Sequence, residues 1–277
     1  MIFQNFHTRY NKRILLIGSD SFLGKNIISE IPYKKIICIQ RNKKNIIRKK
    51  NLKYYFLDLK LFKKLKKIIN DNIFDKVIIC CADNNNTINL NNNNIKIFND
   101  NTNILLNIFE CLKFKKKIEI LNFTSSEVLK KKITIYSISK NTNNKLCEFY
   151  KKNYNLKIKN IILTNVFGGN DLNFNRIVPF LIRCAIFNKK IILKNSSYKL
   201  KFIYIENLLK ILTLKLKNKY FNHSITILGL KKKILYIMKL KKNKRKKIYF
   251  KKDTFNFYLL NTISWYENYF KKNNIKI

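Results

Sequence analysis

Short apolar runs, each long enough for one strand, alternate with helix-like patterns over residues 1–165. Buried strands are typically short runs rich in Ile, Val, Leu and aromatic residues. Such runs cover residues 14–17, 36–39, 54–57, 77–80, 118–123 and 158–163. Apolar residues at helical spacing separate several of them, for example over 61–69 and 97–112. This alternation predicts an α/β fold with a doubly wound parallel sheet, in which ligands bind at the carboxyl ends of the strands.

A loop with the sequence GSDSFLG follows the first predicted strand and spans Gly18 to Gly24. Gly18 permits a tight turn, and Gly24 allows the following helix, expected to extend to about Ile31, to pack closely on the strand. The N-terminus of that helix can bind a pyrophosphate. Ser21 takes the place of the middle glycine of the usual dinucleotide-binding pattern. The loop therefore predicts a site for a dinucleotide cofactor.

The ends of the next two strands indicate which dinucleotide binds. Enzymes specific for NAD usually carry an acid after the second strand, whereas an Arg suits the 2′-phosphate of NADP. Gln40 and Arg41 follow that strand here, which favours NADP, although Arg41 also begins an ordinary solvated basic run. After the third strand, Asp58 precedes Leu59, and a short acid at this place either caps a helix start or contacts the adenine amino group.

The fifth predicted strand leads into a hydroxyl-rich segment, FTSSEVLKKKITIYSISK, from Phe123 to Lys140. Tyr136 and Lys140 are four residues apart, so they share one face of a helix. The Lys140 ammonium would lower the pKa of the Tyr136 phenol from its reference value of about 10. Ser125 would hydrogen-bond the same substrate oxygen, so that Tyr136 can act as acid or base during a hydride transfer. A Tyr–Lys pair at this spacing also arises by chance in a Lys-rich chain.

The chain is strongly basic, with 59 Lys and Arg residues, 15 Asp and Glu residues and a formal charge of +44. Such a charge often indicates a nucleic-acid partner. The Lys residues are spread over the whole length, however, Asn and Ile are also abundant, and there are only 5 Gly and 2 Pro residues. Mutational drift towards A/T-rich codons explains this bias, so we do not expect nucleic acid as the partner.

The 6 Cys residues lie mostly in apolar runs without metal-binding spacing, and the chain has only 2 His residues. We therefore expect buried, reduced thiols and no metal site. The first residues lack the apolar segment of a signal peptide, and no later run approaches the ~18 apolar residues of a membrane span. These features predict a cytoplasmic protein without a membrane partner.

Further motifs follow the sixth predicted strand. The sequence TNVFGGND covers Thr164 to Asp171, and the segments IVPFLI at 177–182, KFIYI at 201–205 and TISWYE at 262–267 come after it. Taken in order with the earlier motifs, they resemble the extended short-chain dehydrogenases of the nucleotide-sugar epimerase and dehydratase group. The resemblance spans nearly the whole chain. It implies a Rossmann-like NAD(P)-binding domain over residues 1–165 and a smaller, partly interwoven α+β domain for the nucleotide sugar over residues 166–277.

The resemblance also implies roles for individual residues. The catalytic residues would be Ser125, Tyr136, Lys140 and Glu127. The cofactor, NADP or alternatively NAD, would contact Gly18, Ser21, Phe22, Leu23, Gly24, Arg41, Asp58, Leu59, Ala82, Lys140 and Leu163. The nucleotide sugar would contact Asn165, Arg176, Arg183 and Lys201. A homodimer is the expected assembly.

Within this group, the segment after the sixth strand most resembles GDP-L-fucose synthase, an NADPH-dependent epimerase and reductase. The two epimerisation residues of that subfamily, a Cys and a His, match Glu127 and Arg176 here. A guanidinium stays protonated and cannot act as a base, whereas the ketone reduction needs only the Ser–Tyr–Lys group. Ser125-Ser126-Glu127 also resembles the motif of the sugar 4,6-dehydratases and decarboxylases, in which a glutamate removes a proton beside a transient ketone.

Three interpretations of function therefore remain open. The first is a GDP-L-fucose-synthase-like epimerase and reductase, and the second is a 4,6-dehydratase, 4-epimerase or decarboxylase with Glu127 as base. The third is a catalytically degenerate NADP-binding or basic interaction protein. Ser21, the charge of +44 and Leu200, which stands where the group usually has a phosphate-binding Arg, motivate the third. Residues 231–252 are mostly Lys and lack the usual signature of the substrate domain.

Overall fold

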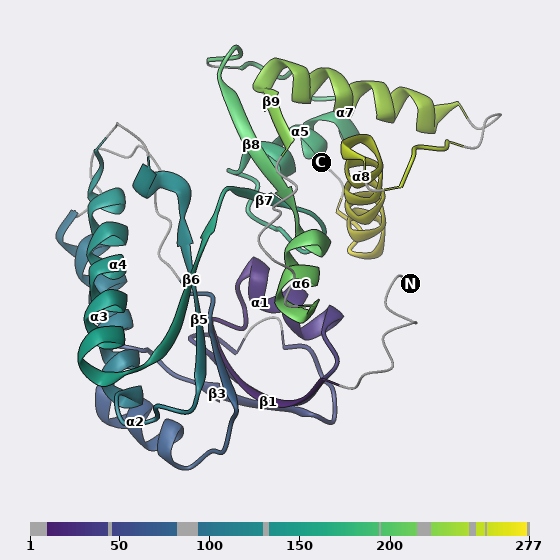
Figure 1. The fold of residues 1–277 in the computed structure, drawn as a ribbon. Helices are drawn as coiled ribbons and strands as arrows, with labels where there is room; N and C mark the ends of the chain where they lie inside the picture. Colours follow the sequence, from purple (N-terminus) through teal and green to yellow (C-terminus); the bar gives the residue numbers. More distant parts are fainter. Residues whose placement is uncertain are drawn as a thin grey trace. The chain divides into compact units, whose positions relative to one another are not determined.

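The fold was obtained as a computed structural model, which describes residues 10–43, 46–81, 94–129, 133–193, 195–214, 223–243, 248–252 and 254–275 (Figure 1). The chain divides into two compact units, unit 1 from Met1 to Leu163 and unit 2 from Thr164 to Ile277. The binding of NAD(P) by the first and of a nucleotide sugar by the second stays a prediction.

Unit 1 is built on a six-stranded sheet in which neighbouring strands are parallel. The strand order is β3-β2-β1-β4-β5-β6. The order reverses between β1 and β4, and such a point is where doubly wound sheets bind ligands. The predicted fold class is confirmed. The strands are β1 Tyr10–Ile17, β2 Tyr33–Gln40, β3 Leu52–Phe56, β4 Lys76–Ile79, β5 Glu119–Ser125 and β6 Lys157–Leu163.

The central strands are buried on both faces, which explains their continuous apolar runs. Residues 14–17 of β1 have no exposed surface. On one face, Leu15 and Ile17 belong to a core cluster that also contains Leu65 of α2 and Leu105 of α3. The amphipathic helices thereby cover the sheet. The helices of unit 1 are α1 Phe22–Glu30, α2 Phe62–Asn70, α3 Asn94–Leu112, the short 3-10 helix η1 Ser126–Leu129 and α4 Ile135–Tyr154.

Strand β3 differs from the prediction in its limits. It covers Leu52–Phe56 rather than residues 54–57, and it pairs with β2 at the edge of the sheet. Its residues are either half-buried or exposed, so its ends are not marked by a purely apolar run. Leu57 is buried but lies beyond the strand. Strand β1 also differs, because it begins at Tyr10, four residues before the predicted run, and polar residues such as Lys12 and Arg13 lie within its first half.

Unit 2 is a smaller α+β unit. In its three-stranded sheet, β8 lies between β7, to which it is parallel, and β9, to which it is antiparallel. Rings from β7, β8 and α8 contact one another, including Phe167 with Tyr204 and Phe255. The elements are β7 Asn165–Phe167, α5 Ile177–Ile186, β8 Lys199–Tyr204, α6 Ile205–Leu214, β9 His223–Thr226, α7 Ile227–Lys242 and α8 Phe255–Lys272.

The Lys-rich segment after residue 230 is largely helical. Helix α7 begins after Thr226, whose hydroxyl accepts a hydrogen bond from the Gly229 N–H. Leu230, Ile234 and Ile237 recur at helical spacing and are buried, whereas Lys232, Lys239 and Lys242 are exposed. The segment is thus an amphipathic helix that packs against α5 and α8. In the part of the chain that the structure describes, no helix is long and apolar enough to cross a membrane.

Candidate cofactor and active site

The loop between β1 and α1 holds its two glycines in close backbone contacts. Gly18 has a φ of +84°, and a Cβ atom there would lie 2.8 Å from the backbone nitrogen of Cys81. A Cβ atom on Gly24 would lie 2.4 Å from the Gly18 carbonyl oxygen. The Gly18 N–H also donates to the Ile39 carbonyl at 2.9 Å, which fixes the loop to β2. The roles predicted for both glycines, a tight turn and close helix packing, agree with these contacts.

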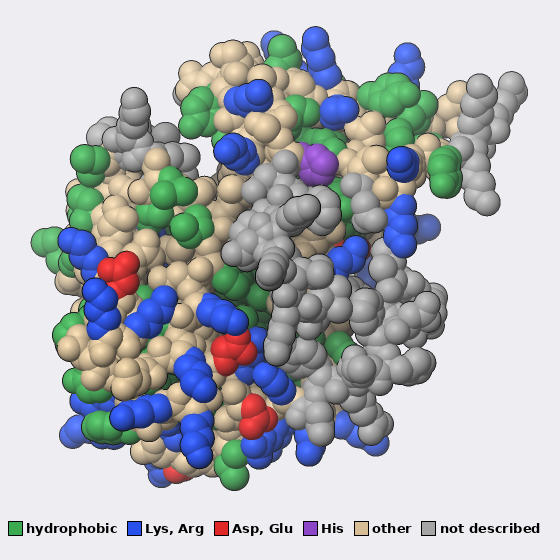
Figure 2. Space-filling model, in the orientation of Figure 1, with side chains coloured by type: hydrophobic (Ala, Val, Ile, Leu, Met, Phe, Trp, Pro, Cys, Tyr) green, Lys and Arg blue, Asp and Glu red, His purple; other side chains and the backbone are tan. Residues whose placement is uncertain are grey.

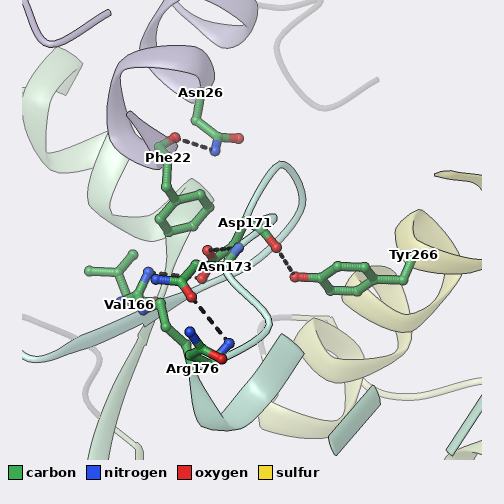
Figure 3. Close-up of polar contacts among 8 residues, drawn as sticks. Phe22, Asn26, Val166, Asp171, Asn173, Arg176 and Tyr266 are labelled. Carbon is green, nitrogen blue, oxygen red and sulfur yellow. Dashed lines mark hydrogen bonds and ion pairs between the residues drawn. The ribbon is translucent and has the colours of Figure 1, made fainter. Parts of the chain in front are cut away.

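Ser21 has a local role at the start of α1. Its hydroxyl oxygen accepts a hydrogen bond from the Gly24 N–H at 3.0 Å, so Ser21 is the N-cap of the helix. A capping hydroxyl of this kind satisfies one of the backbone donors at a helix start. Within the same turn, the Asn26 amide donates to the Phe22 carbonyl at 2.9 Å (Figure 3). Ser21 therefore caps the start of α1 at the position of the missing middle glycine.

A cavity of about 290 Å³ lies at the carboxyl ends of β1, β2 and β3. It brings together five of the predicted cofactor residues, namely Gly18, Ser21, Arg41, Asp58 and Leu59. The other lining residues in the described part of the chain are Asp20, Ile39, Gln40, Leu57, Lys60, Cys81, Asp100 and Ile104. Phe22, Leu23 and Gly24 form the first turn of α1 beside this cavity without lining it.

Gln40 occupies the end of β2 with both ends of its amide engaged. The Ser19 hydroxyl donates to Gln40 Oε1 at 2.7 Å, and Gln40 Nε2 donates to the Asn42 carbonyl at 2.6 Å. Ser19 and Gln40 are both buried. These bonds hold the turn that carries the exposed Arg41 at the cavity. The end of β2 thus presents a neutral amide and a guanidinium instead of an acid.

Asp58 and Lys60 form the opposite side of the cavity. The Asp58 carboxylate accepts the Lys60 N–H at 3.0 Å, so it closes the turn before α2 while it lines the cavity. The Lys60 ammonium forms an ion pair with Asp100 of α3 at 2.6 Å, and this contact raises the pKa of Lys60. Sequence reasoning missed Lys60, Asp100 and Cys81. Cys81 alone carried a signal, because it is the second residue after β4, at the carboxyl edge of the sheet.

Tyr136 and Lys140 lie on one buried face of α4. Thr134 and Ser137 form a capping box that starts the helix, with the Ser137 N–H donating to Thr134 Oγ1 at 3.1 Å. Tyr136 is 6% exposed and Lys140 is 4% exposed. The Lys140 ammonium lies 5.4 Å from the centre of the Tyr136 ring. Burial lowers the pKa of Lys140 from its ordinary value.

A second cavity, of about 10 Å³, lies at Lys140. Cys81 and Ile104 line both this cavity and the larger one, so Lys140 is adjacent to the predicted cofactor site. Burial raises the pKa of the Cys81 thiol to about 11, so this thiol is neutral at physiological pH. The remaining lining residues are Ile79, Asn101, Leu105, Asn122, Phe123, Thr124 and Asn143.

Four other predicted residues belong to the same unit. Ser125 is the last residue of β5 and is paired in register with Leu163, the last residue of β6. Both therefore lie at the carboxyl edge of the sheet. The backbone of Glu127 is in η1, but its side chain lies outside the described residues. Ala82 also lies outside them.

The residues predicted to bind the sugar lie in unit 2. Asn165 Nδ2 donates to the Lys201 carbonyl at 3.0 Å, which ties β7 to β8. The Lys201 side chain is exposed. The guanidinium of Arg183 lies 5.1 Å from the centre of the Phe174 ring. Lys201 thus lies on β8, and Arg183 lies on α5.

Arg176 is engaged within its own loop (Figure 3). Its Nη1 forms an ion pair with Asp171 Oδ2 at 2.8 Å, and its Nη2 donates to the Val166 carbonyl at 3.3 Å. The Tyr266 hydroxyl of α8 donates to the Asp171 carbonyl. The Asp171 side chain is 3% exposed, so Arg176 neutralises an almost fully buried carboxylate. This network fixes the loop after β7.

The surface charge is dispersed. On the face drawn in Figure 2, Lys and Arg side chains lie among apolar and neutral side chains over many elements and do not gather into one stripe. A nucleic-acid-binding surface typically concentrates its cations along one face or groove. The explanation of the charge by codon bias stays a prediction.

Comparison with known proteins identifies the family. Residues 14–227 match the model of the NAD dependent epimerase/dehydratase family. A search of the curated proteins found no match. Among solved structures, the Bordetella bronchiseptica enzyme WbmF in complex with NAD+ and UDP is similar with a TM-score of 0.80 and 16% identity, over 96% of this chain and 95% of that chain.

Two further structures are similar in fold. UDP-glucose 4-epimerase from Thermotoga maritima, solved with UDP-glucose, has a TM-score of 0.75 and 14% identity, over 93% of this chain and 99% of that chain. dTDP-glucose 4,6-dehydratase from Bacillus anthracis, in complex with NAD, has a TM-score of 0.75 and 17% identity, over 94% of this chain and 97% of that chain. Together with the family match over most of the sequence, the glycine loop and the cavity beside Lys140 make this chain a member of the NAD dependent epimerase/dehydratase family.

Proposed function

We propose that the chain is an NAD(P)-dependent nucleotide-sugar enzyme that transfers a hydride at a sugar carbon, with Ser125, Tyr136 and Lys140 as its acid–base group. One observation carries the proposal. Lys140 lies buried against the Tyr136 ring, and its cavity shares Cys81 and Ile104 with the cavity beside the glycine loop. A proton-transfer group is thus adjacent to a site suited to a dinucleotide.

The residues present fit a nicotinamide dinucleotide. The loop from Gly18 to Gly24 has no room for a Cβ atom at either glycine, and it places the N-terminus of α1 beside the cavity. A helix N-terminus favours a pyrophosphate. Asp58 and Leu59 line the side of the cavity suited to the adenine. When bound, the nicotinamide would accept or return a hydride.

The proposed chemistry of the protein residues is a balanced proton transfer. With a nicotinamide bound to accept the C–H hydride of a sugar carbinol, the carbinol O–H proton would move to the tyrosinate oxygen of Tyr136 and a carbonyl would form. Ser125 donates a hydrogen bond to the sugar oxygen, and the Lys140 ammonium stabilises the tyrosinate electrostatically. In the reverse direction, Tyr136 returns the proton while the hydride returns to carbon. An epimerase carries out both directions in one catalytic cycle.

We propose NADP as the preferred cofactor and NAD as the alternative. The end of β2 offers the amide of Gln40 and the guanidinium of Arg41, and an Arg suits a 2′-phosphate. The solved structures of WbmF and of the B. anthracis dehydratase contain NAD. The two cofactors therefore have to be compared directly in this chain.

For the reaction class, we favour ketone reduction or epimerisation at one carbon, as in the reductive step of GDP-L-fucose synthase. Arg176 matches one epimerisation residue of that subfamily. It is a protonated guanidinium paired with Asp171, so it cannot remove a proton from the sugar. A 4,6-dehydratase or decarboxylase with Glu127 as base is the second candidate, favoured by the motif Ser125-Ser126-Glu127. Asn165, Arg183 and Lys201 remain the proposed sugar-nucleotide contacts of unit 2.

The test is incubation of the purified full chain with a panel of GDP-, UDP- and dTDP-sugars. Each sugar is supplied with NADP+, NADPH, NAD+ or NADH, and the products are identified by mass spectrometry and by NMR of the sugar ring. A product at unchanged mass indicates an epimerase, a gain of two hydrogens a reductase, and a loss of water a dehydratase. The Tyr136→Phe variant is the control. If none of the sugars were converted and the chain bound DNA tightly, the third interpretation, a basic interaction protein, would be favoured.

We also propose a cytoplasmic homodimer. All six cysteines are free thiols, as expected in a reducing compartment. The exposed apolar side chains Leu106 of α3, Ile138 and Phe149 of α4 would be covered by a second copy. Sedimentation of the wild-type chain and of Phe149→Lys tests the assembly, because a buried Lys at a symmetric contact would shift the dimer towards monomers. A monomeric wild-type chain would contradict it.

A further inference from the structure

The segment that follows β3 is tied to α3 beside the larger cavity. The Lys60 ammonium forms an ion pair with Asp100 of α3 at 2.6 Å. The side-chain amide of Asn107, also on α3, donates to the Leu59 carbonyl at 3.0 Å and to the Lys60 carbonyl at 3.4 Å. Asp100 and Asn107 are about two helical turns apart, so they lie on one face of α3. One helix face thus holds the segment through two polar ties, the ion pair and the amide.

An apolar part of the cavity wall lies between these two ties. Ile104 is about one turn from both Asp100 and Asn107, and it lines the cavity together with Leu59. Ile104 and Leu59 are half-buried and pack against the same core cluster of unit 1. Helix α2 begins after Leu61 without a hydrogen bond from a capping side chain. The position of the segment before α2 therefore depends in part on its contacts with α3.

The ion pair also sets the charge on this side of the cavity. The Asp100 side chain is 10% exposed, whereas that of Lys60 is 45% exposed. A nearly buried carboxylate is costly without a partner, and it would also repel an anionic ligand. The hydrogen bond to Asp100 raises the pKa of Lys60 and the charge of Arg41 opposes this rise, so Arg41 and Lys60 are neighbouring cations. Asp100 therefore holds one of these two cations on the side of α3.

We propose that Asp100 and Asn107 are positioning residues for the adenine half of the cofactor. The inference rests on the proposed function, because it assigns the adenine to the side of the cavity that Asp58 and Leu59 line. A purine has two flat faces that pack well against aliphatic side chains whose positions are fixed. The two polar ties fix the position of Leu59 relative to Ile104, and the ion pair neutralises the carboxylate beside them. Both residues of α3 thus act on the cofactor through the segment after β3.

Calorimetric titration of the full chain with the adenine half of each cofactor tests the proposal. The probes are ADP-ribose for NAD and 2′-phospho-ADP-ribose for NADP. Asn107→Leu removes the amide without a change of charge and should weaken binding about tenfold, since residues in one contact network typically couple by about this factor. The double variant Lys60→Met/Asp100→Leu should have a similar effect. It removes both charges of the ion pair at once, so the net charge of the cavity stays constant and electrostatic attraction of the probe is not altered.

Two further measurements separate positioning of the adenine from a general loosening of unit 1. The exchanged variant Lys60→Asp/Asp100→Lys restores an ion pair of opposite polarity, so it should recover most of the lost affinity. In Asn107→Leu, each dinucleotide should lose affinity by the same factor as its own adenine half, because the two ties hold only the adenine side. A clearly larger loss for NADH than for ADP-ribose, or for NADPH than for 2′-phospho-ADP-ribose, would overturn the positioning role.

The matched controls lie on the same helix. Lys113→Met/Glu110→Leu removes an ion pair of 2.7 Å, and Asn103→Leu replaces an exposed amide. None of these three residues lines the cavity, so both controls should bind the probes like the wild type. If one of the two test variants does not fold, the other decides, because each removes a separate tie.

The wild-type chain separates the two ways in which the experiment can fail. If it bound neither probe, the proposed cofactor site would be wrong, and this inference would be wrong with it. If it bound a probe and the folded test variants bound that probe equally tightly, only the role of Asp100 and Asn107 would be overturned. An equal loss in the test variants and in the controls would likewise overturn that role, because it would come from α3 as a whole.

Discussion

Gly24 packs so closely beneath Gly18 that a Cβ atom on Gly24 would lie 2.4 Å from the Gly18 carbonyl oxygen and 2.8 Å from the Ser19 carbonyl oxygen. Both neighbours are backbone atoms, so neither can move without a shift of the loop. The loop in turn lines the cavity proposed for the cofactor. The packing of this one pair of glycines therefore determines the shape of that side of the cavity.

We expect Gly24→Ala to weaken cofactor binding at least tenfold and to destabilise the chain by about 1–3 kcal/mol, as overpacking of a tight site typically does. Calorimetric titration and urea unfolding measure the two effects. Gly229→Ala, in α7 of unit 2, is the control. Its Cβ would first meet side-chain atoms of Thr226 and Ile225, the nearest at 3.0 Å. A Gly24→Ala protein with wild-type affinity would show that the loop does not bind the cofactor.

Tyr136→Phe should lower turnover of a competent nucleotide sugar by about 10²–10⁴-fold, because it removes a general acid–base group. Cofactor affinity should stay nearly unchanged, since the ring still packs beside Lys140. Tyr150→Phe is the matched control on the same helix. It removes a 2.5 Å hydrogen bond to Glu110 and should reduce stability without affecting turnover. Wild-type turnover in Tyr136→Phe would refute the site assignment.

Arg41→Asp should reverse the preference between the two cofactors. The change removes a charged hydrogen bond to a 2′-phosphate, worth about 1.5–3 kcal/mol, which corresponds to roughly 10–100-fold in NADPH affinity. NADH affinity should fall little or rise. Arg48→Asp is the control, since Arg48 is exposed in the same basic segment and does not line this cavity. Equal affinities for NADPH and NADH in the unmodified chain would contradict the NADP assignment.

Asp75→Asn should destabilise the chain at neutral pH and have little effect near pH 2. Arg13 bonds the Asp75 carboxylate through Nε at 3.1 Å and Nη2 at 2.7 Å, and this contact lowers the pKa of Asp75 to about 2. A lowered carboxylate pKa contributes stability above the unfolded value of about 3.9 that is lost as the pH falls towards 2. The pair is half-exposed, so the effect should be modest.

Urea unfolding at pH 7, 4 and 2 measures this dependence. Asp71→Asn is the control, because Asp71 is exposed at the end of α2 and forms no ion pair within the described part of the chain. The difference between the Asp75 and Asp71 variants should shrink as the pH falls. A constant difference at all three pH values would mean that the carboxylate contributes through shape and not through charge.

The sequence predicted most of the fold of unit 1. Strands β1 and β4 are buried on both faces. Such burial leaves a continuous apolar run, which can be recognised in the sequence without knowing which strands pair with it. The glycine loop and the Tyr136–Lys140 spacing were equally readable, because a turn and a helix face are set by neighbours in sequence. The starts of β1 and β3 were not predicted, because polar residues such as Arg13 and Lys53 lie within these strands and no apolar run marks where they begin.

Contacts between distant residues were decided only by the tertiary structure. Nothing local to Gln40 indicates that its amide is bonded by Ser19, and nothing local to Asn143 indicates that it lines a small cavity with Lys140 and Thr124. The same holds for Arg176, whose predicted role in sugar binding has to be weighed against its ion pair with Asp171. Apolar periodicity specifies which residues are buried, since burial depends on each residue's own transfer free energy. Which buried polar groups meet depends on strand order and on how the helices pack, and these arise only when the whole chain has folded.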